Sequence, residues 1–88
     1  MTNTEFTFTF VCEYKGTDDE LMGELKSIDL DDALIGTGRG EGHVSLRFTR
    51  SGFYYETEVW LVAREIAIHL PNVSVKTIYR GETRHENI

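Results

Sequence analysis

Residues 5–14 alternate between large apolar side chains and smaller or polar ones, and this pattern limits the fold more than any other feature. The apolar set is Phe6, Phe8, Phe10, Cys12 and Tyr14. A period of two with aromatic enrichment is typical of a β-strand that buries one face. The chain therefore contains a sheet with one covered face, and its 88 residues suffice for a single core.

Two later segments have the spacing of helices. The run Thr-Asp-Asp-Glu at residues 17–20 has the pattern of a capping box, and apolar residues follow it three and four apart. We therefore expect a helix from about Asp18 to Ile28. A second amphipathic helix is predicted from about Tyr54 to the residue before Pro71, with Ser51 as its candidate cap.

Three further strands complete the pattern. Residues 33–35 and 43–49 indicate a hairpin joined by a glycine-rich loop at 36–42, and residues 73–79 alternate again. The order β-α-β-β-α-β predicts an α+β domain over residues 1–80. It is typical of a ferredoxin-like split β-α-β fold, a four-stranded antiparallel sheet with two helices on one face. Residues 81–88 are polar and are predicted to form a disordered C-terminal tail.

Charge and targeting signals narrow the classes of partner. The formal net charge of −6 argues against nucleic acid held by summed positive charge. Residues 1–32 carry nine acids and two bases, so the acidity belongs to the first third of the chain. The sequence has no signal peptide, no lipidation motif and no apolar run of the roughly 20 residues that a membrane span needs. We expect a cytoplasmic protein that does not contact a membrane.

No residue constellation typical of catalysis, cofactor binding or metal binding is present. The glycine-rich loop lacks the third glycine of a dinucleotide fingerprint and precedes a strand rather than a helix. The histidines lack metal-ligand spacing, and Asp29, Asp31 and Asp32 lack the spacing of a calcium loop. Cys12 shares the parity of the buried phenylalanines, which argues against a nucleophile. We predict no enzyme, no cofactor and no metal.

The uncovered sheet face is the expected contact surface. Its predicted residues are mainly threonines and serines with a few cations, whereas the aromatics take the opposite parity, which argues against RNA binding by base stacking. The candidates for partner contact are Arg39 in the loop, Arg47, Lys76 and Arg80 on the open face, and the acidic Asp18, Asp19 and Glu20.

A resemblance to a known family covers less than half of the chain. It is carried by Asp32-Ala33-Leu34, the glycine-rich loop, and residues 44–50 leading into a helix. This pattern resembles a poorly characterised ferredoxin-like domain that precedes a helix-turn-helix in bacterial regulatory proteins. Ser51-Gly52 replaces the small helix-starting residue of that family, and the helix-turn-helix is missing. Any DNA-binding role that the resemblance implies is therefore not carried over, and a role in protein–protein interaction or ligand sensing remains.

Together these observations favour a small non-enzymatic protein-interaction or regulatory module of a bacterium or phage. A homodimer formed through the sheet or an edge strand is one form that this function can take. The alternative is a sensor domain that binds a small anionic ligand at the glycine-rich loop and the open sheet face. A cavity lined by Arg39 and Arg47 would favour the sensor, and a flat open face would count against it.

Overall fold

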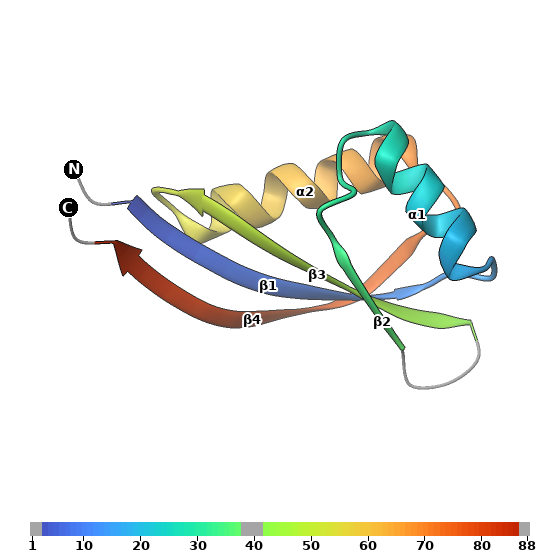
Figure 1. Ribbon diagram of the computed structural model, residues 1–88, viewed down its shortest axis with the longest axis horizontal. Helices are drawn as coiled ribbons and strands as arrows, with labels where there is room; N and C mark the ends of the chain where they lie inside the picture. The colour runs from blue at the N-terminus through green and yellow to red at the C-terminus, as the bar shows by residue number, and fades with distance from the viewer. Residues whose placement is uncertain (1–2, 38–41, 87–88) are drawn as a thin grey trace.

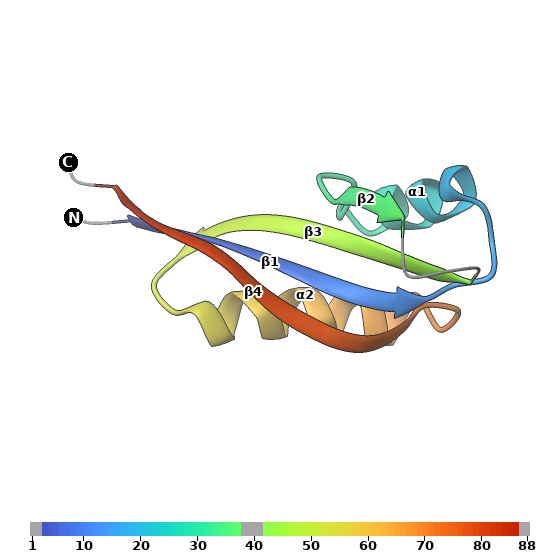
Figure 2. The same ribbon diagram turned by 90° about the horizontal axis from the view of Figure 1, so that it is seen from below.

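The computed structural model describes residues 3–37 and 42–86. Its elements follow the order β1 (Asn3–Glu13), α1 (Asp18–Ser27), β2 (Leu34–Thr37), β3 (His43–Gly52), α2 (Tyr55–His69) and β4 (Ser74–Glu86). The strands form one antiparallel sheet in the order β2-β3-β1-β4. Figure 1 and Figure 2 show both helices on the same side of this sheet. The predicted α+β class, with a four-stranded antiparallel sheet and two helices, is confirmed.

The core lies between the sheet and the helices and is built on β1. Phe8, Phe10 and Cys12 are completely buried, as the alternation predicted. The rings of Phe8, Phe10 and Phe48 have centroids 5.5–5.9 Å apart. Tyr55, in the first turn of α2, packs edge-on against Phe8 at 6.1 Å. These contacts join the two central strands to α2. Aromatic pairs at this separation contribute a favourable interaction energy in addition to that of burying their surface.

The capping box of α1 forms as predicted. Thr17 Oγ1 accepts a hydrogen bond from the backbone N–H of Glu20 at 3.1 Å, and the Thr17 N–H donates to Glu20 Oε1 at 3.2 Å. Leu21 and Leu25 are completely buried. The acidic first turn also suits the positive end of the helix dipole.

Replacement of Gly23 with alanine is expected to raise the free energy of unfolding by about 1 kcal/mol. Gly23 is an exposed residue inside α1, and a Cβ built there meets no atom within 4 Å. Urea denaturation measures the change. Gly81→Ala is the control, and it is expected to lower the free energy of unfolding. The Cβ of an alanine at position 81 would lie 2.9 Å from the Thr7 carbonyl oxygen. A gain in stability from Gly81→Ala, or a loss from Gly23→Ala, would contradict this interpretation.

The register of β4 differs from the predicted alternation. Two irregularities interrupt its pairing with β1, one between Phe6 and Phe8 and one between Val11 and Cys12. At the second irregularity, Val75 pairs with Cys12 and Thr77 pairs with Val11, so the register skips Lys76. One extra residue in a strand exchanges the faces of the residues that follow it. Here the exchange applies to residues 77–80, because the irregularity between Phe6 and Phe8 adds a second extra residue to β4.

This exchange corrects two predictions about the sheet. Arg80 lies opposite Phe8 and Ile78 opposite Phe10, so both belong to the helix-covered side and not to the open face. Tyr79 lies opposite Thr9 and therefore stands on the open face. The prediction that the aromatic side chains of the sheet all point toward the helices is thus wrong for this tyrosine.

The predicted boundaries at the C-terminus and before α2 are also corrected. Residues 81–86 continue β4 and pair with the first residues of β1, with Arg84 opposite Glu5, instead of forming a disordered tail. Residues 87–88 of that tail lie outside the described residues. The N-terminal half of β1 offers backbone donors and acceptors that need a partner, and β4 supplies it. β3 runs through Ser51, so the N-cap of α2 is Tyr54, with no side-chain cap bond.

Candidate functional site

The cations predicted to form a contact surface do not gather in one place. Arg47 is exposed on the open face of β3, opposite Thr9 of β1. Lys76 lies at the irregularity of β4, with its Nζ 3.8 Å from Glu13 Oε2. Arg39 lies outside the described residues.

Arg80 packs against α2. Its guanidinium carbon lies 4.3 Å from the centroid of the Tyr55 ring, and its Nη2 donates to Thr83 Oγ1 at 3.4 Å. A hollow of about 250 Å³ borders this contact, with Phe53 and Tyr54 on its rim. A cation over an aromatic face is attracted by the ring quadrupole, so Arg80 covers the end of the aromatic core.

The predicted acidic candidates occupy the first turn of α1. Asp18, Asp19 and Glu20 are all exposed. Glu20 belongs to the capping box and also borders a polar hollow at the end of the sheet. The structure therefore gives Glu20 a local role in starting the helix.

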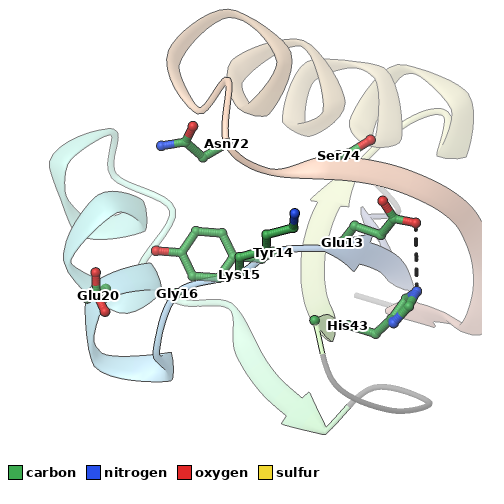
Figure 3. A pocket seen from close by; sticks show the side chains of 9 residues that line it. Glu13, Tyr14, Lys15, Gly16, Glu20, His43, Asn72 and Ser74 are labelled. Atoms are coloured by element: carbon green, nitrogen blue, oxygen red, sulfur yellow. Dashed lines mark ion pairs between the residues drawn. The ribbon is translucent and has the colours of Figure 1, made fainter.

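The polar hollow has a volume of about 510 Å³ and lies where β1 ends and β3 and β4 begin (Figure 3). Glu13 Oε1 stands 3.8 Å from His43 Nε2 across it. Its lining consists of Glu13, Tyr14, Lys15, Gly16, Glu20, Gly42, His43, Asn72 and Ser74. This lining combines two carboxylates with one ammonium and one imidazole group, so it does not concentrate charge of one sign.

Tyr14 joins this hollow to α1. Its hydroxyl donates to Glu24 Oε2 at 2.8 Å. Burial, followed by the hydrogen bond to Glu24 and the negative charges of Glu24 and Glu20, raises the pKa of Tyr14 to about 12. The phenol therefore remains protonated at neutral pH, where it serves as a fixed hydrogen-bond donor and not as a base.

Metal binding and membrane insertion find no support in the described residues. Over 3–37 and 42–86, no group of three histidine, cysteine or acidic side chains is placed to hold a metal ion. Asp32, one of the clustered loop acids, instead forms an ion pair with Arg50. Neither helix in the described part of the chain is long and apolar enough to cross a membrane.

The open sheet face is mostly polar. Leu34, Arg47, Thr9 and Tyr79 lie side by side across the four strands, as the register of each pair shows. Leu34 is 66% exposed and Tyr79 is 51% exposed. The neighbouring row contains Ser45, Val11 and Thr77. Leu34 and Tyr79 therefore stand on the two outer strands, and the surface between them is polar apart from one valine.

The side of α2 that faces away from the sheet carries a second apolar stripe. Trp60, Leu61 and Ile68 are 59%, 45% and 58% exposed. Arg64 lies among them, with its guanidinium carbon 5.4 Å from the centroid of the Trp60 ring. We call Thr57, Trp60, Leu61, Arg64 and Ile68 the outward face of α2.

The inner stripe of the same helix is buried in the core. Val62 is 3% exposed and Ile66 is completely buried. A helix with apolar side chains on two sides covers only one of them against its own sheet. The sequence pattern predicted one amphipathic helix here and did not identify its outward face. The signal that indicates this face is the seven-residue spacing of Leu61 and Ile68, with Trp60 beside them.

No protein-family model, curated protein or solved structure matches this chain.

Proposed function

We propose that this chain is a small non-enzymatic protein-interaction module that binds its partner through the outward face of α2. The observation that carries the proposal is the exposure of Trp60, Leu61 and Ile68 on one side of a helix whose other side is already buried. Full burial of a large apolar side chain contributes about 1.5–3 kcal/mol, and about half of the surface of each of these three is still exposed to water. Large apolar side chains gathered on an exposed surface are typical of protein-binding sites.

We further propose that the module has a ferredoxin-like split β-α-β fold. Starting from the β4 edge, the strand order is β4-β1-β3-β2. β1 and β2 are both antiparallel to β3, which lies between them, and β3 and β4 are both antiparallel to β1. Two β-α-β units, each split by a strand of the other, support this assignment. The role in protein–protein interaction that the family resemblance leaves open agrees with a binding module.

An anion sensor has weaker support. The polar hollow contains Glu13 and Glu20, and its described lining does not include Arg47. The two carboxylates offset the positive charge in the lining, so the hollow has no excess of positive charge to attract an anion. The observations thus favour the interaction module over the sensor.

Site-specific photo-crosslinking in the host cell tests the interaction. With a photoreactive phenylalanine derivative in place of Leu61, we expect an adduct of discrete mass. The matched position is Leu34, which is also an exposed leucine but stands on the open face. The same derivative at Leu34 is expected to yield no adduct, and Ile68→Asp is expected to abolish the adduct formed at position 61.

The results distinguish the outward face of α2 from the open sheet face. An adduct from position 34 alone would indicate that the partner binds the open face, and it would contradict the proposal. The absence of an adduct from both positions would contradict an interaction function. Thermal melting checks that each variant folds, since substitutions at exposed positions are expected to change stability by less than about 0.5 kcal/mol.

A further inference from the structure

One edge of the sheet is long and has no neighbouring strand. β2 and β4 are the outer strands, and β2 has four residues whereas β4 has thirteen. Within residues 3–37 and 42–86, β4 pairs with β1 alone, and its residues 76–82 are all exposed. An outer strand presents unpaired backbone N–H and C=O groups that can pair with a further strand. β4 therefore offers the longer site at which a strand can be added.

Two large apolar side chains stand at the middle of this edge. Ile78 is 43% exposed on the helix-covered side, and Tyr79 is 51% exposed on the open face. Phe10 lies opposite Ile78 on β1 and is completely buried, so the helices cover β1 but leave β4 partly in water. A strand added beside β4 would cover apolar surface on both faces of the sheet.

We infer that a second copy of this chain occupies the edge, with the two β4 strands antiparallel and the two-fold axis at Tyr79. In this arrangement Tyr79 meets Tyr79 of the second copy, and each residue before it meets the residue equally far after it in the other copy. Hydrogen bonds between the two β4 strands then join the two sheets into one. The edge of β4 is a different surface from the outward face of α2, so the inference does not rest on the proposed function.

The irregularities of β4 are symmetric about Tyr79. The first skips Lys76, three residues before Tyr79, and the second includes Glu82, three residues after it. Residues that oppose each other in paired strands stand on the same face of the sheet. Pairing about Tyr79 satisfies this condition beyond both irregularities. The matched pairs are Ile78 with Arg80 and Val75 with Thr83 on the helix-covered side, and Ser74 with Arg84 on the open face.

Neighbouring registers fit less well. An axis at Arg80 would place Thr77, on the open face, opposite Thr83, on the helix-covered side. An axis at Gly81 would bring Tyr79 opposite Thr83, with the same conflict of faces. An axis between Gly81 and Glu82 keeps the faces matched, but it places no two opposite charges across from each other within the described strand.

Charge complementarity favours the axis at Tyr79. Each Lys76 then lies opposite Glu82 of the other copy, which gives two pairs of opposite charge. Glu82 is exposed and belongs to no ion pair in the described part of the chain.

The contact of Lys76 with Glu13 leaves its ammonium group available. The side chain of Lys76 is 50% exposed, and its Nζ lies 3.8 Å from Glu13 Oε2, beyond hydrogen-bond length. An ammonium group has three N–H donors, so it can also meet a second carboxylate. Charged side chains on an edge hinder pairing with unrelated strands, and they favour a strand that carries the complementary charges.

Disulfide trapping tests the position of the axis. Cα atoms of directly opposed residues lie about 4.5–5.5 Å apart, within the range of a disulfide. Thr77→Cys is the matched control for Tyr79→Cys, because position 77 is also exposed on the open face of β4. The two copies of position 77 would be roughly 13 Å apart along the strands, which is too far. Under mild oxidation we expect the linked dimer to form about tenfold faster from Tyr79→Cys. Cys12 stays in both variants, since it is completely buried.

Charge exchange tests the contact between Lys76 and Glu82. Lys76→Glu and Glu82→Lys are each expected to weaken dimerisation about tenfold in low salt, because each replaces two pairs of opposite charge with two of like charge. The double variant restores the opposite charges and is expected to restore the dimer. Lys26→Glu, at an exposed position of α1, changes the net charge as Lys76→Glu does and is expected to have no effect. Sedimentation equilibrium measures each dissociation constant, and thermal melting checks that each variant folds.

Four results would overturn the inference. They are a monomer throughout the micromolar range, equal trapping at positions 79 and 77, a double variant that does not restore the dimer, and a dimer that Leu61→Asp dissociates. The last result would assign the dimer to the outward face of α2. A monomeric chain that still forms the adduct at position 61 would reject the dimer and leave the proposed function standing.

Discussion

Replacement of Phe8 with alanine is expected to lower the free energy of unfolding by about 3–5 kcal/mol. Phe8 is completely buried at the centre of the aromatic cluster, where its ring contacts those of Phe10, Phe48 and Tyr55. Truncation removes the apolar burial and leaves a cavity between the two central strands and α2. Because small domains are stable by only about 5–15 kcal/mol, we expect a large decrease in the urea midpoint.

Phe53→Ala is the matched control for this prediction. It removes the same atoms from a side chain that is 70% exposed in the turn between β3 and α2. The expected loss is less than about 0.5 kcal/mol, since substitutions at exposed positions rarely cost more. Equal losses for the two variants would mean that the core is not centred on Phe8.

The thiol of Cys12 is expected to react about 100-fold more slowly with a disulfide reagent in the native protein than in urea at pH 8. Burial raises the pKa of Cys12 from 9.0 to about 11. Only the thiolate attacks, and two pH units correspond to a hundredfold smaller thiolate fraction. The side chain is also completely covered by the core, which slows the reaction further. Rapid labelling of the folded protein would contradict this placement.

The same shift predicts how stability depends on pH. The folded state holds the Cys12 proton up to about pH 11, whereas the unfolded chain releases it near pH 9.0. Stability is therefore complete below pH 9 and is lost as the pH rises, by roughly 2–3 kcal/mol from this group. The raised pKa of Tyr14, from 10.0 to about 12, acts in the same direction above pH 10. In Cys12→Ala, the loss of stability that begins near pH 9 is expected to be absent, whereas the contribution of Tyr14 remains. Chemical denaturation at pH 8 and at pH 10.5 measures the difference.

Elements governed by local chemistry were predictable from the sequence. β1 has a phenylalanine at every second position from Phe6 to Phe10. The capping box that sets the start of α1 is formed by Thr17 and Glu20, which are only three residues apart. Both signals depend on neighbours along the chain, so they are visible without a tertiary structure.

The faces of β4 were not predictable in this way. The alternation of residues 73–79 suggested one register, but the irregularity at Lys76 exchanges the two faces for residues 77–80. That irregularity lies in the pairing of β4 with β1, and the extension to Glu86 follows the edge of β1 that β3 leaves uncovered. Both are contacts between the first and the last strand of the chain. The misplacement of Arg80 and Tyr79 has the same cause.

The outward face of α2 was not predictable from the sequence either. Residues 59–70 are apolar in several directions around the helix. Periodicity shows that such a helix has more than one apolar stripe, but only the position of the sheet decides which stripe becomes core. The predicted contact cations were chosen by strand parity, and the shift in β4 separated Arg80 from Arg47 and Lys76.

By itself, the sequence determined the class of the domain, the order of its elements, the buried face of β1 and the cap of α1. These properties follow from side-chain periodicity and from hydrogen bonds between residues that are close along the chain. Only the tertiary structure decided the register of β4, the side of the sheet on which Arg80 and Tyr79 stand, and the exposure of Trp60, Leu61 and Ile68. Burial is a property of the whole packed chain, so a pattern can show that a side chain is apolar but not what covers it.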